Sequence, residues 1–481
     1  MDNRRVQYAA ARSTAIVCVA AVLAACGPGG GVGGGGGPAT LSPATADVPV
    51  GGSATFTLSP AQAANWTVND LVGGTATVGK ITAIGVYTAP FMIPGPTTVT
   101  TVTIGASGAT NTATVNVVRR FVAAGTQSIG SCTPSCTPNA VIAPDLNGDG
   151  LSDLVTANAG NGTISIVMRG SASTFSAPVP YAVGPSPTAE PQALVAGDFN
   201  GDSRRDLVIA DADSSAPAVW TRVGQGDGTF PAELSVGLAA GSNPLSIASG
   251  RFDPDTNLDV VVANFVTSTL SILRGDGTGT FSTPTTISSG IASPLGVAVA
   301  DLNQDGYDDI AVANSGDSTV AVFMGVGNGT FQTEQIYAMS ARPSAVVATD
   351  LNGDGFSDLA VTTATGRQLV LVINKGTSAT SGSTFNPPTT TYATGVQPIA
   401  LAAADINRDG FQDLAVVNQG DNTVTVFLGY GDGTAVASET YPVGTAPQSV
   451  AVGDFNGDGS PDLAVANSGD DTVTILRNRG S

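Results

Sequence analysis

The sequence of 481 residues predicts an all-β protein, with a small β-sandwich followed by a seven-bladed β-propeller. Three observations lead to this fold class. A short acidic phrase recurs seven times, about fifty residues apart, in the C-terminal three quarters of the chain. Each copy lies between two runs of Val, Ala, Ile and Leu of strand length. The 61 glycines and 29 prolines favour many turns over long helices.

Residues 1–25 have the pattern of a secretory signal peptide. Three arginines precede an apolar run that is too short to span a membrane, and the run ends in Leu-Ala-Ala before Cys26. This ending resembles the bacterial lipobox, which implies cleavage before Cys26 and lipid attachment to its sulfur. An ordinary signal peptide with an incidental cysteine is the alternative. Residues 26–38 are mostly glycine and are expected to form a flexible tether.

Residues 39–118 carry no acidic phrase and have the pattern of short strands separated by turns. The expected strands are Ser53 to Leu58, Asn65 to Val68, Gly79 to Ala83, Thr97 to Gly105 and Thr112 to Val118. The segment resembles bacterial immunoglobulin-like domains, which implies a small β-sandwich that acts as a spacer. Trp66 is expected in its core, and a ligand-stacking role is the alternative.

Cys132 and Cys136 are the only cysteines downstream of Cys26. In an exported protein the favoured interpretation is a disulfide between them, because the compartment is oxidising. Free thiols and a two-cysteine metal site are the alternatives.

The acidic phrase has the spacing of a calcium loop. Oxygen-bearing side chains at positions 1, 3, 5 and 9 suit a hard cation, and a glycine at position 6 permits a sharp turn. The predicted ligands are Asp145, Asn147, Asp149 and Asp153; Asp198, Asn200, Asp202 and Asp206; Asp253, Asp255, Asn257 and Asp259; Asp301, Asn303, Asp305 and Asp309; Asp350, Asn352, Asp354 and Asp358; Asp405, Asn407, Asp409 and Asp413; and Asp454, Asn456, Asp458 and Asp462.

Two of the seven loops depart from this pattern. Ser203 replaces the glycine in the second loop, and the third loop, from Asp253 to Asp259, is two residues short. The sequence therefore predicts up to seven Ca²⁺ ions, of which five or six are expected to be bound. An Asx turn without metal is the alternative for any single copy.

Repeats with Asp-x-Asn-x-Asp-Gly-x-x-Asp between strands, Gly-Asp-Gly-Thr-Phe-like turns and a period near fifty resemble the FG-GAP/VCBS family, as in integrin α-chain propellers. The resemblance covers residues 119–481. It implies that the loops lie on one face and that position 7 contributes a backbone carbonyl. The last repeat stops at Ser481 after three strands, so the segment near Phe121 to Ala124 is expected to supply the fourth and close the ring.

The composition restricts the function. Without histidine, the chain lacks the usual general base and zinc ligand, which argues against an enzyme. Two lysines and a net charge of −20 argue against a nucleic-acid partner. The expectation is a calcium-stabilised, non-enzymatic recognition or adhesion module that binds an extracellular protein or glycan through the face opposite the calcium loops.

The N-terminal lipid would anchor this module to the bacterial envelope, at the outer membrane or the cell surface. Two alternatives remain open. One is a carbohydrate-active propeller, lectin-like or resembling a polysaccharide lyase, with Trp220 as the sugar-stacking candidate. The other is a passive envelope spacer.

Overall fold

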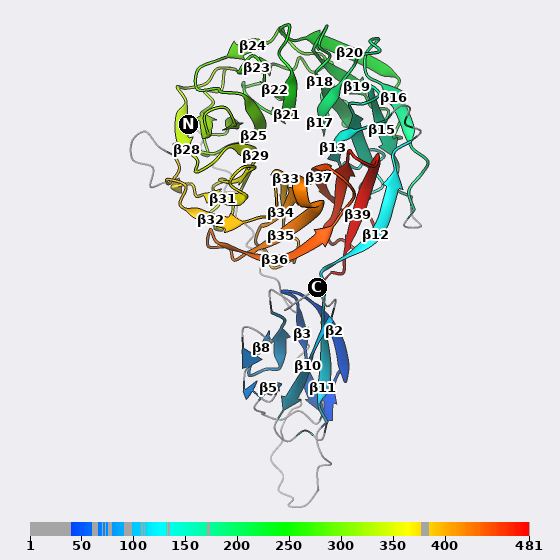
Figure 1. Ribbon diagram of the computed structural model, residues 1–481, viewed down its shortest axis with the longest axis vertical. Helices are drawn as coiled ribbons and strands as arrows, with labels where there is room; N and C mark the ends of the chain where they lie inside the picture. Colours follow the sequence, from blue (N-terminus) through cyan, green and yellow to red (C-terminus); the bar gives the residue numbers. More distant parts are fainter. Residues whose placement is uncertain are drawn as a thin grey trace, which may run out of the picture.

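The computed structural model describes residues 40–480, except 60–65, 70, 73, 76–78, 91–98, 107–108, 110, 131, 133–134, 171–173 and 377–383. The predicted signal peptide, Cys26 and glycine tether therefore lie outside the described residues. The predicted all-β class is confirmed: a smaller N-terminal unit precedes a ring of sheets (Figure 1). Within the described part of the chain, no helix has the length and hydropathy of a membrane span.

The N-terminal unit is built from short strands. They are β1 (Thr40–Ser42), β2 (Thr45–Pro49), β3 (Ser53–Thr55), β4 (Thr57–Ser59), β5 (Trp66–Val68), β6 (Leu71–Val72), β7 (Gly74–Thr75), β8 (Gly79–Ile81), β9 (Val86–Thr88), β10 (Val99–Ala106) and β11 (Ala113–Val118). One sheet has the order β2-β11-β10-β5-β6, the second has the order β3-β9-β8-β7, and β1 pairs with β4. Only β2 and β11 pair in parallel in the described part of this unit.

A common core joins the two sheets. It contains Phe56, Trp66 and Tyr87, so the expected core position of Trp66 is confirmed. The single strand expected from Ser53 to Leu58 is wrong, because the chain turns inward at Phe56. The Phe56 ring is fully buried and its N–H donates to the Gly85 carbonyl at 2.9 Å, after which β4 pairs with β1 instead of β9.

The described residues of the ring form seven four-stranded antiparallel sheets, numbered here from 1 to 7 along the chain. Their strands are, in sheet 1, β13 (Pro138–Ile142), β14 (Leu154–Asn158), β15 (Thr163–Val167) and β16 (Val179–Ala182); in sheet 2, β17 (Pro191–Gly197), β18 (Asp206–Asp211), β19 (Ala218–Val223) and β20 (Ala232–Gly237); in sheet 3, β21 (Pro244–Gly250), β22 (Asp259–Asn264), β23 (Thr269–Leu273) and β24 (Thr285–Ile287); in sheet 4, β25 (Pro294–Ala300), β26 (Asp309–Asn314), β27 (Thr319–Phe323) and β28 (Gln335–Ala338).

The remaining sheets repeat the pattern. They comprise, in sheet 5, β29 (Pro343–Thr349), β30 (Asp358–Thr363), β31 (Gln368–Val372) and β32 (Thr390–Ala393); in sheet 6, β33 (Pro398–Ala404), β34 (Asp413–Asn418), β35 (Thr423–Gly429) and β36 (Ala435–Pro442); in sheet 7, β37 (Pro447–Gly453), β38 (Asp462–Asn467), β39 (Thr472–Asn478) and β12 (Phe121–Ser128). A short 3₁₀ turn, η2 (Gln419–Asp421), links β34 and β35.

The second strand of each sheet is buried along its whole length. Neighbouring sheets cover both of its faces, and this explains why these strands read as continuous Val, Ala, Ile and Leu runs instead of alternating. The fourth strands lie at the outer edge, where much of their surface is exposed (Figure 1).

The first strands contact one another in succession from β13 to β37, and β37 contacts β13, so the seven sheets complete a circle. Sheet 7 combines the two ends of the ring-forming sequence. β12 pairs with β39 from Phe121 opposite Asn478 to Ser128 opposite Thr472, with an irregularity between Ala123 and Gly125. This is the pairing expected from the sequence, and it extends four residues beyond the expected Ala124.

Candidate metal-binding loops and an axial cavity

The acidic loops share one end of the ring. Each loop connects the first strand of a sheet to the second, and the first strands all run from the opposite end toward the loops. Position 9 of the loop either starts the second strand, as Asp206 and Asp358 do, or directly precedes it, as Asp153 does.

In each complete loop, backbone N–H groups donate to side-chain oxygens of the same loop. The loop that starts at Asp350 is an example. Asp350 Oδ1 accepts the Gly353 N–H at 2.7 Å, and its Oδ2 accepts the Gly355 N–H at 2.8 Å. Asn352 Oδ1 accepts the Asp354 N–H at 2.9 Å. Gly355 has φ +88°, which explains the preference for glycine at position 6. Positions 1, 3 and 5 are thus gathered inside one turn.

The aspartate at position 9 has a different role, which sequence reasoning missed. In Asp358, Oδ2 accepts the Leu351 N–H at 2.9 Å and Oδ1 accepts the Asn374 N–H at 2.7 Å. The carboxylate therefore ties the loop to the end of the third strand. The equivalent residue is fully buried in every loop: Asp153, Asp206, Asp259, Asp309, Asp358, Asp413 and Asp462.

Burial raises the pKa of every position-9 carboxyl. Desolvation is the largest cause, and the aspartates at positions 1 and 5 add repulsion, while backbone N–H donors oppose the shift. The pKa rises to about 7 in Asp309 and Asp413 and to about 6 in Asp259, Asp358 and Asp462. The pKa values of Asp153 and Asp206 are also raised. The loops thus concentrate negative charge that a cation would offset.

The donor set fits calcium in chemistry, because every candidate ligand is a carboxylate or amide oxygen. The geometry is less complete. Among the described residues, no group of three or more carboxylates or thiolates is arranged to hold a metal ion. Position 9 is fully buried, whereas Asp350, Asn352 and Asp354 of the same loop are partly or fully exposed, so positions 1, 3 and 5 are the side chains best placed to bind first. The predicted calcium ligands remain a prediction.

The two irregular loops differ from each other. Ser203 adopts a left-handed φ of +67° and its N–H donates to Asp198 Oδ2 at 2.8 Å, so the second loop keeps the regular hydrogen bonds despite losing the glycine. In the shortened third loop the Arg274 guanidinium lies 3.9 Å from Asp253 Oδ2. An arginine thus offsets part of the charge there, which makes this loop the weakest calcium candidate.

A cavity of about 300 Å³ lies at the opposite end of the ring. Each of the seven sheets contributes the residue that follows the proline at the start of its first strand: Asn139, Gln192, Leu245, Leu295, Ser344, Ile399 and Gln448. Asn139 Nδ2 donates to Gln192 Oε1 at 2.6 Å across neighbouring sheets. No ionisable side chain lines this axial cavity among the described residues. Sequence reasoning missed it, although the recurring proline marked the position.

The turns between second and third strands are explained by hairpin chemistry. Asn158 Nδ2 donates to Thr163 Oγ1 at 3.1 Å and to Ser165 Oγ at 2.8 Å. Asn264, Asn418 and Asn467 make the corresponding bonds. These residues therefore need no ligand to account for their recurrence.

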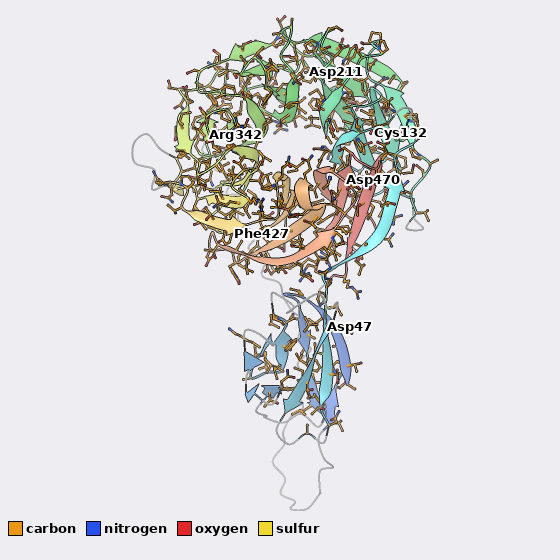
Figure 2. The ribbon with its side chains drawn as sticks, in the orientation of Figure 1. Asp47, Cys132, Asp211, Arg342, Phe427 and Asp470 are labelled. Carbon is orange, nitrogen blue, oxygen red and sulfur yellow. A yellow bond between two sulfur atoms is a disulfide. The ribbon has the colours of Figure 1, made fainter. Side chains whose placement is uncertain are left out.

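Sheet 2 departs from this pattern, since Asp211 stands where those sheets have asparagine. Trp220 Nε1 donates to Asp211 Oδ2 at 3.1 Å (Asp211 is labelled in Figure 2). The Trp220 ring packs so closely on Gly184 that a Cβ there would lie 2.5 Å from it. These contacts favour the packing role over the sugar-stacking role for Trp220.

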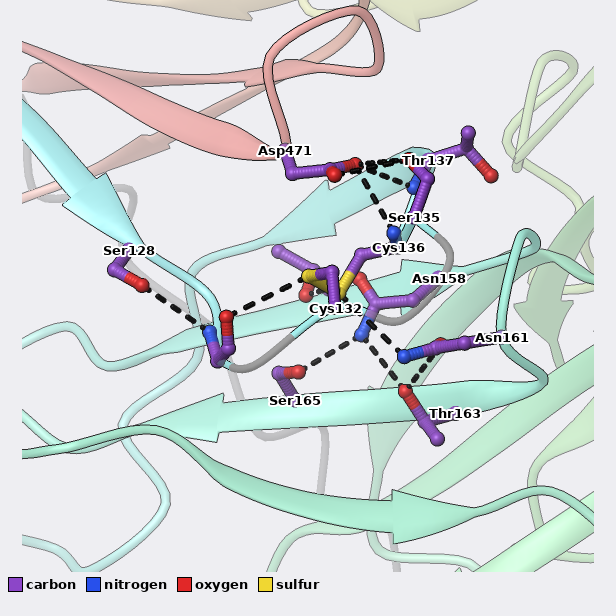
Figure 3. The surroundings of a disulfide bond; sticks show 12 residues. Ser128, Cys132, Ser135, Cys136, Thr137, Asn158, Asn161, Thr163, Ser165 and Asp471 are labelled. Carbon is purple, nitrogen blue, oxygen red and sulfur yellow. Dashed lines mark hydrogen bonds between the residues drawn. A yellow bond between two sulfur atoms is a disulfide. The ribbon is translucent and has the colours of Figure 1, made fainter.

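Cys132 and Cys136, the expected disulfide partners, are joined in the structure (Figure 3). The Asp471 carboxylate holds their loop by accepting the Ser135 hydroxyl at 2.8 Å and the N–H groups of Cys136 at 3.0 Å and Thr137 at 2.8 Å. The disulfide loop is thereby fastened to the turn between β38 and β39.

The circle of four-stranded sheets with a recurring acidic loop defines a repeat protein of the β-propeller type. The sequence matches the FG-GAP-like repeat at residues 145–209, 198–262, 251–312, 301–361, 350–416 and 405–465, which together cover about two thirds of the chain. The chain therefore belongs to the FG-GAP-like repeat family. No curated protein matches the sequence.

Solved structures support the fold. A streptogramin B lyase is 14% identical, with a TM-score of 0.51 over 74% of this chain and 98% of the lyase. Virginiamycin B lyase from Staphylococcus aureus is 12% identical, with a TM-score of 0.51 over 74% and 99%. BBS1N, in a complex with ARL6DN, is 15% identical, with a TM-score of 0.52 over 74% and 97%. At these identities the likeness concerns the fold alone.

Proposed function

We propose that the protein is a calcium-stabilised recognition module, built as a seven-bladed propeller on an immunoglobulin-like spacer and held at the bacterial envelope by a lipid on Cys26. Its partner is an extracellular protein or glycan that binds over the axial cavity. The acidic loops at the other end have a structural role. Calcium bound there would be held first by positions 1, 3 and 5 and would offset the carboxylate charge of each loop.

The axial cavity is the observation that carries this proposal. All seven sheets converge on it, and its lining combines amide and hydroxyl groups with Leu and Ile side chains. Asn139, Gln192 and Gln448 come from sheets adjacent in the circle, and Leu245 and Leu295 come from the next two. Such a surface offers hydrogen bonds on one side and apolar contact on the other, which suits recognition of an uncharged group.

Catalysis is less well supported than recognition. The similar enzyme from Staphylococcus aureus is catalytically inactive when one of its histidines is replaced by alanine. This chain contains no histidine, and its axial cavity offers no carboxylate, lysine, arginine or tyrosine as a substitute among the described residues. The BBS1N structure, by contrast, is a complex with another protein, which is the behaviour proposed here.

The test is a protein and glycan array probed with residues 39–481, with calcium and with chelator. A bound partner is then measured against a Gln192→Glu/Gln448→Glu double variant, which places charge in the axial cavity. We expect binding to fall at least tenfold. Thr283→Glu, an exposed change near the outer strand β24, is the control and should bind normally. Equal binding by all three proteins would place the partner site elsewhere, and product release from a glycan would favour the carbohydrate-active alternative.

A further inference from the structure

A second cavity, of about 400 Å³, opens between sheets 3 and 4 near the outer strand β24. Its apolar lining includes Ile272, Ile287, Phe323 and Phe331. It is remote from the axial cavity and has no part in the function proposed above.

Equivalent junctions elsewhere in the ring show what is missing at this one. In sheets 1, 4, 5 and 6 the fourth strand carries a tyrosine opposite the second residue of the third strand: Tyr181, Tyr337, Tyr392 and Tyr441. Each ring packs on a phenylalanine of the next sheet, with centroids 5.4 to 6.1 Å apart. In sheet 3 the residue in this register, opposite Leu270, is Ile287.

The tyrosine hydroxyls also satisfy a backbone donor of the following sheet. Tyr181 Oη accepts the Phe230 N–H at 3.3 Å, and Tyr337 Oη accepts the Phe385 N–H at 3.1 Å. Tyr392 and Tyr441 accept the N–H groups of Ala435 at 2.9 Å and Phe121 at 3.2 Å. At the sheet 3 to sheet 4 junction the corresponding donor is the Phe331 N–H. It has no hydrogen-bond acceptor in the described part of the chain.

The burial of the phenylalanines agrees with this comparison. Phe230 is 1% exposed and Phe385 is fully buried beneath their tyrosines, whereas Phe331 is only partly buried. Sheets 2 and 7 also lack the tyrosine and have Val236 and Gln127 in its place. At these junctions, as at this one, a phenylalanine of the acidic loop packs on a phenylalanine of the next sheet, with centroids 5.3 to 6.0 Å apart: Phe199 on Phe281, Phe455 on Phe175 and Phe252 on Phe331. Phe281 is only 8% exposed. The Leu234 side chain of sheet 2 helps to cover that junction. It lies so close to Gly279 of sheet 3 that a Cβ atom added to Gly279 would be 3.5 Å from Leu234 Cδ1.

We infer that the cavity between sheets 3 and 4 binds a neutral phenol ring, in the place that a tyrosine side chain fills at four other junctions. The ring would pack on Phe331, and the phenol oxygen would accept the Phe331 N–H. The volume is sufficient, since an apolar cavity of about 150 Å³ binds benzene. At the rim, the Glu334 carboxylate accepts the Ser289 hydroxyl at 2.7 Å, and its charge disfavours anionic ligands. A phenol is neutral at pH 7, because its pKa is about 10.

The test is titration of the purified protein with p-cresol, followed by calorimetry and saturation-transfer NMR. We expect one site with a Kd on the order of 1 mM or tighter, and benzoate should bind at least tenfold more weakly. A tyrosine-containing tripeptide with blocked ends forms a second arm. If it binds more tightly than p-cresol, the natural ligand is a tyrosine of a polypeptide; if only p-cresol binds, it is a free phenol.

Two Ile→Tyr variants make the assignment specific. Ile287→Tyr should fill the cavity, abolish p-cresol binding and raise the melting temperature. Ile336→Tyr places the same residue at a 49% exposed position on the neighbouring strand β28 and should bind p-cresol normally. Tyr337→Ile should create a second site, which changes the stoichiometry from one to two.

No binding of p-cresol to the unmodified protein, or undiminished binding to Ile287→Tyr, would overturn the inference. Neither result bears on partner binding at the axial cavity. Should Tyr337→Ile fail to fold, the two Ile→Tyr variants decide the question without it.

Discussion

The position-9 aspartate is the residue on which each acidic loop depends most. It is fully buried, it accepts N–H groups from the loop and from the end of the third strand, and positions 1 and 5 surround it with negative charge. Hydrogen bonds to a carboxylate are stronger than those to a neutral oxygen. Losing one acceptor leaves a buried N–H unsatisfied, which is costly.

Asp309→Asn should therefore destabilise the ring by about 2 kcal/mol, because the amide nitrogen would face either the Leu302 or the Gly325 N–H. Urea unfolding in calcium at pH 7.5 measures the change. Asp317→Asn is the matched control: Asp317 is exposed and accepts the Thr319 hydroxyl at 2.8 Å, so its loss should cost less than about 0.5 kcal/mol. Equal midpoints for the two variants would refute the structural role of position 9.

The pH dependence of the metal-free protein follows from the same residue. The folded pKa is raised to about 7 in Asp309 and Asp413, above an unfolded value of about 4. These groups therefore favour folding below pH 4, and that stability is lost as pH rises through 7. With chelator, the melting temperature should be several degrees lower at pH 8 than at pH 5. Calcium should remove most of the difference, and a chelated protein that is more stable at pH 8 would contradict the assignment.

At the residue scale the sequence predicted which side chains gather in each loop, because carboxylates at fixed spacing around a glycine leave few conformations open. It could not predict that position 9 binds backbone groups on both sides. One of those donors, such as the Asn374 N–H, lies sixteen residues further along the chain. The cavity between sheets 3 and 4 could not be predicted from the sequence either, because it depends on the strand register that places Ile287 opposite Leu270.

The pairing of β12 with β39 is the element that completes the circle. Phe121 is 1% exposed and packs edge-on against Tyr441 with centroids 5.4 Å apart, so the strand also fills the junction with sheet 6. The sequence predicted this element because the last repeat ended one strand short. The short strands of the N-terminal unit were harder to predict, since β1, β2 and β9 have only three to five residues each.

Deletion of residues 119–127 should prevent the ring from folding, because β39 would present an unpaired edge and sheet 6 would lose its cover. Circular dichroism with thermal melting measures the effect. Deletion of residues 40–117 is the control, since it removes the N-terminal unit but keeps β12, and the ring should still melt cooperatively. An unchanged melting curve after the first deletion would show that β12 does not complete the ring.

On the scale of the whole molecule, the charge is concentrated at one end of the ring. The chain has a net charge of −20, and each loop contributes at least three aspartates. Repulsion among these aspartates opposes the compact state. A divalent cation bound between them makes the electrostatic energy of the loop favourable. Calcium would therefore stabilise all seven sheets through one common end.

Calcium removal should lower the melting temperature of the ring. Extracellular modules typically bind calcium with a Kd of ~0.1–1 mM. Each filled site adds ~2.7 kcal/mol to the free energy of unfolding when the calcium concentration is about a hundred times the Kd. Differential scanning calorimetry with chelator and with 10 mM calcium measures the change, and equal magnesium serves as the control because it demands stricter geometry. An unchanged melting temperature after verified metal removal would contradict a structural role for the ions.

The strand β12 also connects the ring mechanically to the N-terminal unit. The Val50 N–H donates to the Val118 carbonyl at 3.1 Å, the Arg120 side chain donates to the Val50 carbonyl, and the Arg120 N–H donates to Glu439 at 2.9 Å. Tension applied through the N-terminal unit would enter the ring along this strand and shear its bonds with β39 together instead of breaking them singly. The joint is thus arranged to bear load along the strand.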